Sequence, residues 1–152
     1  MRATSSNVVT MDSMIDRLNA LAGRHEGTGD GAESGPFTAT LHIEPMLGSL
    51  GTAISYTAID PSGEQLHTER TTLARDMLSG HLTLFVLCEE LSGLGQLSEI
   101  SDGVFDNGAG VDGFELQITI GLTVDEVTYT WSWSPPGEPL AEQSRATFSL
   151  TG

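Results

Sequence analysis

Lysine is absent from the chain, and its six basic residues, all arginines, are outnumbered by 21 aspartates and glutamates. The formal net charge is therefore −15 at pH 7. A surface this acidic repels the phosphates of nucleic acids and of anionic lipids, so we expect neither a nucleic-acid partner nor a membrane partner. The same charge balance fits a GC-rich bacterial genome or a salt-adapted cytoplasm, and we favour the genome because it requires no selection.

Cysteine occurs once, at Cys88, so the chain cannot form an internal disulfide and secretion gains no support. Cys88 ends the apolar run 82–88, and we interpret it as a small buried side chain rather than a catalytic thiol. No stretch approaches the ~18 continuous apolar residues of a membrane helix, and the N-terminus has no apolar signal segment. These absences predict a cytoplasmic protein.

Two segments near the C-terminus alternate apolar and polar residues, which is the pattern of a strand with one buried face. Every even position is apolar in 114–122, and every odd position is apolar in 127–134. Similar but shorter patterns and turn residues between them predict further strands at 24–28, 37–44, 54–58, 66–74, 81–88, 97–105 and 145–150. The strand at 81–88 is apolar on both faces, so we expect it to be covered on both sides or to meet a partner subunit.

Before these strands, apolar residues at helical spacing predict one helix at about 11–22, with Gly23 as its stop. Thr10, Asp12 or Ser13 would cap its start. We interpret 1–9 as a flexible polar leader. The segment 26–36 is rich in glycine and acidic residues, which predicts a mobile loop after the short strand at 24–28.

At 152 residues the chain has the length of one domain, which we place at 10–152. Eight to ten strands in series, joined by short turns, favour a mostly β fold in which a single antiparallel up-and-down β-barrel closes. A sandwich would require long crossover connections. The predicted helix would cap one end of the barrel.

One segment resembles the opening of a known group of barrels. The sequence Leu-Ala-Gly-Arg-His-Glu-Gly-Thr-Gly at 21–29 is similar to the Gly-x-Trp-x-Gly-x-Gly motif of calycin-like barrels, with His25 where that group has tryptophan. Residues 41–48, 54–56 and 60–64 resemble the next hairpin of small bacterial members of unknown function. The group includes lipocalins, fatty-acid-binding proteins and nitrobindins, and the resemblance implies a barrel that encloses a small molecule.

The same resemblance argues against haem as a cofactor. In nitrobindin-like barrels the iron ligand is a histidine late in the chain, whereas no histidine follows His81 here. We therefore expect no cofactor.

An aromatic row on the strand at 127–134 is the strongest candidate for a ligand-binding wall, because small barrels either fill with side chains or enclose one ligand. Arg70 lies an even number of positions from Leu66 and Ala74, so the three lie on one face of the predicted strand. If that face is the interior, Arg70 points toward a carboxylate or a ligand's acid group; otherwise it points to the surface. The candidate ligand-binding residues are Tyr56, Arg70, Phe85, Phe114, Tyr129, Trp131 and Trp133.

Two histidine–carboxylate pairs, His42 with Glu44 and His67 with Glu69, have members two residues apart and therefore on one face of a strand. Together they offer ligands for a divalent metal. The residues of the first pair alternate with the apolar residues of their strand and therefore lie on the opposite face. We expect the pairs to face solvent, and we expect no metal site.

These observations lead to a non-enzymatic protein that binds a small hydrophobic or amphipathic molecule inside a barrel. One alternative is an interaction protein with a filled barrel that forms a homodimer through the strand at 81–88. Another is an isomerase or hydrolase that uses His67 or His81 with a carboxylate as acid and base.

Overall fold

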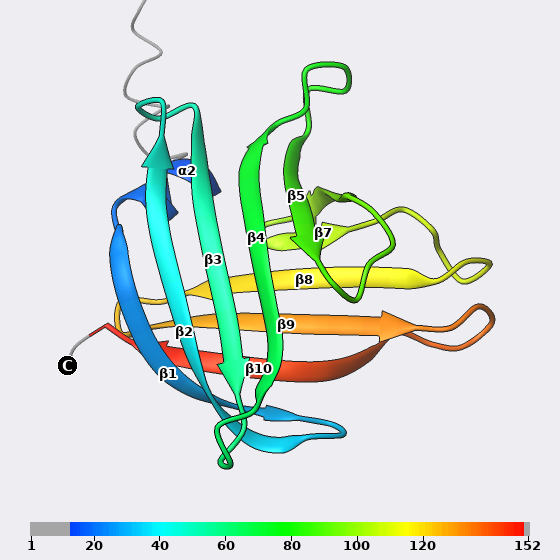
Figure 1. Cartoon of the computed structure of the whole chain (residues 1–152). Coiled ribbons are helices and arrows are strands. Elements are labelled where there is room, and N and C mark those ends of the chain that lie inside the picture. Colours follow the sequence, from blue (N-terminus) through cyan, green and yellow to red (C-terminus); the bar gives the residue numbers. More distant parts are fainter. Residues whose placement is uncertain (1–12, 151–152) are drawn as a thin grey trace, which may run out of the picture.

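The computed structural model describes residues 13–150, which form a closed antiparallel barrel of ten strands preceded by one short helix (Figure 1). The expected mostly β barrel is confirmed. The elements are α2 (Met14–Asn19), β1 (Gly23–Gly31), β2 (Gly35–Met46), β3 (Gly51–Ile59), β4 (Gln65–Arg75), β5 (Leu82–Cys88), β6 (Gly95–Ser101), β7 (Val104–Asp106), β8 (Glu115–Leu122), β9 (Glu126–Ser134) and β10 (Ala141–Ser149). The expected leader at 1–9, Thr10 and Asp12 lie outside the described residues.

Each strand pairs with its neighbours in the chain, and β1 pairs with β10 to close the barrel. Closure leaves no strand edge unpaired. The inner face holds the side chains that alternation predicts, including Leu41, Ile43, Ile54, Leu84 and Ile118, each at most 2% exposed. The period-two pattern thus fixes both the strands and the core.

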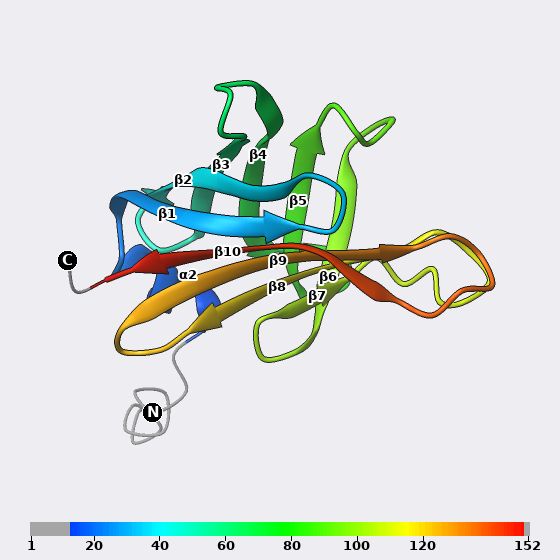
Figure 2. The same ribbon diagram turned by 90° about the horizontal axis from the view of Figure 1, so that it is seen from below.

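Helix α2 closes one end of the barrel. Ser13 is its N-cap, and the side chains of Met14, Ile15 and Leu18 are at most 5% exposed. Asn19 fixes the helix to β3, because its amide donates to the carbonyl of Gly51 and its side-chain oxygen accepts from Thr52. Figure 2 shows α2 at the opposite end from the β9–β10 turn.

The glycine-rich segment after the helix is mostly strand, so the short strand expected at 24–28 is confirmed and the mobile loop expected after it, to residue 36, is wrong over most of its length. Gly27 and Gly29 face inward, and a Cβ on Gly29 would lie 2.3 Å from the ring of Phe37. A Cβ on Gly27 would lie 2.8 Å from the ring of Phe148. The glycines therefore let two aromatic rings pack directly on the backbone of β1, and only the turn at 32–34 interrupts the pairing.

The single strand expected at 97–105 is two strands, β6 and β7. They are separated by a turn in which Gly103 adopts φ +75° and a Cβ would meet the carbonyl of Ile120. A left-handed residue in close contact with backbone requires glycine.

Strand β5 is only partly covered on its outer face. Leu82, Leu84 and Val86 face the core, whereas Leu87 on the other face is 57% exposed. None of the helices in the described part of the chain is long and apolar enough to cross a membrane.

Candidate ligand-binding site

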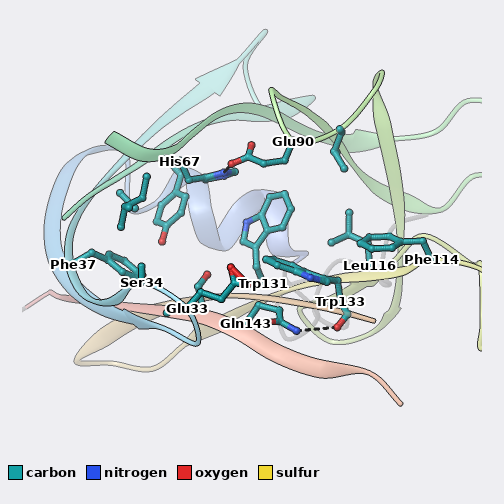
Figure 3. A pocket seen from close by; sticks show the side chains of 16 residues that line it. Glu33, Ser34, Phe37, His67, Glu90, Phe114, Leu116, Trp131, Trp133 and Gln143 are labelled. Carbon is teal, nitrogen blue, oxygen red and sulfur yellow. Dashed lines mark hydrogen bonds and ion pairs between the residues drawn. The ribbon is translucent and has the colours of Figure 1, made fainter. Parts of the chain in front are cut away.

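A cavity of about 490 Å³ opens near the β1–β2 turn, at the end of the barrel away from the contact of α2 with Gly51. Its volume lies in the range of small-molecule sites in proteins, about 300–1,000 Å³. Its wall is mostly apolar, with a few polar side chains at one side and at the mouth (Figure 3). The apolar wall consists of Phe37, Tyr56, Ala58, Leu66, Leu91, Phe114, Leu116, Trp131 and Trp133. The polar side chains are Glu33, Ser34, His67, Glu90, Gln143 and Ser144.

Two β-bulges shape this wall. The pairing of β3 with β4 shifts between Ala58 and Ile59, so that Leu66 is an extra residue and both Leu66 and His67 face the cavity. The pairing of β9 with β10 shifts in the same way around Gln143. A bulge turns two consecutive side chains toward one face, which is how polar groups enter an otherwise apolar lining.

A fully buried carboxylate lies beneath the cavity floor. Glu69 is 1% exposed, and its oxygens accept hydrogen bonds from the Tyr129 hydroxyl at 2.7 Å and the Trp131 indole at 3.0 Å. The Thr71 hydroxyl also donates to it. Burial, followed by the nearby Glu69 charge, raises the pKa of Tyr129 well above its ordinary value, so Tyr129 stays protonated and donates. These donors stabilise the carboxylate in the core.

His67 lies between this buried carboxylate and a second one, Glu90, at the cavity wall. Figure 3 shows His67 beside Glu90. Its Nε2 is 3.0 Å from Glu69 and its Nδ1 is 2.8 Å from Glu90. Burial alone would lower the pKa of His67, but the hydrogen bonds to Glu69 and Glu90 outweigh it, and the pKa is raised. The raised pKa favours the protonated ring, in which both nitrogens donate to the two neighbouring glutamates.

One polar group at the cavity has no partner. The hydroxyl of Tyr56 is buried and makes no hydrogen bond within residues 13–150, although its ring packs against His67 and Tyr129 at centroid distances of 5.8 and 4.7 Å. An unpaired buried hydroxyl costs free energy that a ligand's polar group would offset.

Four of the seven predicted ligand-binding residues, Tyr56, Phe114, Trp131 and Trp133, line the cavity. Tyr129 lies below it in the core, 1% exposed.

The other two predicted residues, Arg70 and Phe85, lie along a separate shallow groove on the outer face of the barrel. The inward orientation considered for Arg70 is therefore wrong. The bulge at Leu66 breaks the alternation, so inward positions on β4 continue through His67 and Glu69 rather than through Leu66 and Arg70.

The solvent-facing expectation is confirmed for His42 and Glu44 and is wrong for His67 and Glu69. The spacing of that second pair identified its shared face, but only the bulge reveals which side of the barrel the face is on. Glu90 follows β5 in a turn, where no periodic pattern marks it. Cys88 is half-buried and faces inward, and burial raises the pKa of its thiol to about 11.

Comparison with known proteins supports the fold. No protein-family model matches the chain, and no curated protein sequence matches it. The crystal structure of Rv2717c from M. tuberculosis is similar with a TM-score of 0.61 and 16% identity, over 91% of this chain and 98% of that chain. A redesigned β-barrel, b11L5F_LGL, is similar with a TM-score of 0.51 and 10% identity, over 93% of this chain and 100% of that one. At these identities the similarity shows a common small barrel and nothing of function.

Proposed function

We propose that the chain is a non-enzymatic barrel that binds a small amphipathic molecule in the cavity near the β1–β2 turn. The observation that carries this proposal is the combination of an apolar cavity of about 490 Å³ with a buried, unpaired Tyr56 hydroxyl on its wall. A barrel interior filled completely by side chains would not leave such a cavity. In a bacterial cytoplasm such a protein would carry, store or sense the molecule.

The charges around the cavity favour a ligand whose polar group is neutral or cationic. Glu33 and Glu90 line the cavity and Glu69 lies directly behind it, while His67 is the one basic side chain among the described lining residues. The chain's net charge of −15 adds to the negative potential. The indoles of Trp131 and Trp133 are aromatic faces of the kind that attract cations. We therefore propose an amine or alcohol with an apolar body rather than a fatty acid.

Catalysis by the histidines has less support than binding. Both ring nitrogens of His67 already contact carboxylates, so His67 has no free lone pair with which to accept a proton. His81 is exposed in the turn before β5 and does not line the cavity. We therefore place the enzymatic alternative behind the binding proposal.

The homodimer remains the other candidate. The outer groove on β3, β4 and β5 includes Phe85, Leu87 and Leu94, of which the last two are each 57% exposed. Sedimentation of the wild-type protein beside a Leu87→Glu variant would test it, and a dimer that this variant abolishes would support it.

The binding proposal is tested with a phenylalkyl amine, alcohol and carboxylic acid of equal chain length, followed through tryptophan emission. We expect saturable changes, with the amine at least about tenfold tighter than the acid because Glu33 and Glu90 repel a carboxylate. Trp133→Ala should weaken amine binding by about 1–3 kcal/mol. Phe85→Ala is the matched control, since Phe85 lies on the outer groove. Flat titrations with all three compounds would overturn the proposal.

A further inference from the structure

We propose that His67, Cys88 and Glu90 bind a divalent transition metal such as Zn²⁺ at the cavity wall, with one coordination position left open toward the cavity. The ligand atoms of these three residues all lie within 4.8 Å of one another. They combine an imidazole, a thiol and a carboxylate, which are the donors that Zn²⁺ prefers. This proposal does not depend on the binding of an amphipathic molecule.

The three ligand atoms lie close enough to surround one tetrahedral ion once Glu90 moves outward. Zn²⁺ binds sulfur at about 2.3 Å and nitrogen or oxygen at about 2.0–2.2 Å, which places donor atoms about 3.3–3.6 Å apart. Here Nδ1 of His67 is 2.8 Å from the Glu90 carboxylate. Only a small outward movement of Glu90 is required, and its side chain is half exposed and therefore able to move.

The strands hold the other two ligands in place. Cys88 is the cross-strand partner of Glu69, so both side chains face the interior, and His67 lies two residues from Glu69 on the same face. Ligands on adjacent strands of a closed barrel are more rigid than ligands on loops.

A second, independent feature points to a metal at His67. Ligating histidines usually donate their other ring N–H to a carboxylate, which fixes the ring and its tautomer. Glu69 does this at Nε2 of His67, 3.0 Å away, and is itself fixed by Tyr129 and Trp131. Nδ1 then faces Glu90 at 2.8 Å, where a hydrogen bond joins them without a metal and both could bind one ion in its place. Binding of the metal would release the proton of this hydrogen bond and the thiol proton of Cys88.

Since three protein ligands leave one position of a tetrahedral ion free, that position is available to water or to a molecule in the cavity. His67 and Glu90 both line the cavity, which places the open position on that side. A bound molecule with a nitrogen or sulfur donor would complete the coordination.

The test uses the full chain without a histidine tag, stripped with a chelator and titrated with Zn²⁺ by calorimetry and with Co²⁺ by absorbance. We expect one ion per chain and a near-ultraviolet Co²⁺–thiolate band, which only Cys88 can produce because the chain has one cysteine. Cys88→Ser should abolish the band. Cys88→Ser and Glu90→Gln should each weaken Zn²⁺ binding at least about tenfold, and Glu69→Gln about 10–100-fold.

The matched control is Glu89→Gln, an adjacent exposed carboxylate outside the cluster, which should change the affinity by less than about twofold. Glu90 is exposed, so Glu90→Gln remains informative even where Cys88→Ser destabilises the fold. A missing thiolate band, or Zn²⁺ affinity equal in the wild-type, Cys88→Ser and Glu90→Gln proteins, would overturn the proposal and assign any bound metal to the acidic surface.

Discussion

The indole Nε1 of Trp131 donates a hydrogen bond to the carboxylate of Glu69 at 3.0 Å, although 62 residues separate them in the chain. This contact joins β9 to β4 across the interior of the barrel. It also joins the apolar wall of the cavity, which contains Trp131, to the polar side, since Glu69 accepts from His67 as well. One buried carboxylate therefore links the apolar wall of the cavity to its polar side.

Removal of this carboxylate should be severely destabilising. Glu69→Ala would leave the Tyr129 hydroxyl, the Trp131 indole and the His67 imidazolium without their buried partner, at a cost of about 3–5 kcal/mol. Glu69→Gln keeps an acceptor and should cost less. Urea unfolding measures both, and Glu44→Ala, on the exposed face of β2, is the control. Equal stability of Glu69→Ala and Glu44→Ala would show that the network contributes nothing.

Stability should decrease as pH rises through the raised pKa of His67. A histidine with a pKa higher in the folded than in the unfolded chain adds stability that is complete below about 6.5 and is lost above the raised value. The pKa of Glu90 is lowered, so the stability that Glu90 adds to the fold is lost only as pH falls through this lowered pKa. Cys88 and Tyr56, which also face His67, have raised pKa values and stay neutral in the folded chain over this range. The thiol of Cys88 ionises at about pH 8.5 in the unfolded chain, so Cys88 also lowers stability toward pH 9, and the comparison with a His67 variant removes this shared effect.

The measurement for this prediction is urea unfolding with a chelator at pH 6 and pH 9. His67→Gln should remove the part of the pH dependence that His67 causes, so the difference between wild type and variant should shrink toward pH 9. A difference that is constant across this range would contradict the raised pKa.

The helix should be essential to the closed end of the barrel. Leu18 is 1% exposed, so Leu18→Asp places a charge without a partner in the core and should cost about 4 kcal/mol or more. Ala20→Asp, on the exposed side of the helix C-terminus, is the matched control. Thermal unfolding compares them, and similar melting temperatures would mean that α2 does not stabilise the barrel.

Alternation and helical spacing were sufficient to predict the barrel, its closing helix and the aromatic row, because each depends on local periodicity. The position of His67 could not be predicted in this way. A bulge inserts one residue at Leu66, and everything after it on β4 changes face, which is why Arg70 lies outside and Glu69 inside. The role of the glycines at 27 and 29 depends on rings from β2 and β10 that only the closed barrel brings near.

The most direct test of ligand binding in the cavity uses the chain's two tryptophans, which both line it. In ¹⁵N-labelled protein the two indole N–H signals are assigned with Trp131→Phe and Trp133→Phe and followed during titration with the phenylalkyl amine. We predict that both signals shift and saturate together, while the backbone amides of Arg70 and Phe85 on the outer groove stay in place. Indole signals that remain fixed while the outer-groove amides shift, or no shift at all, would contradict the account.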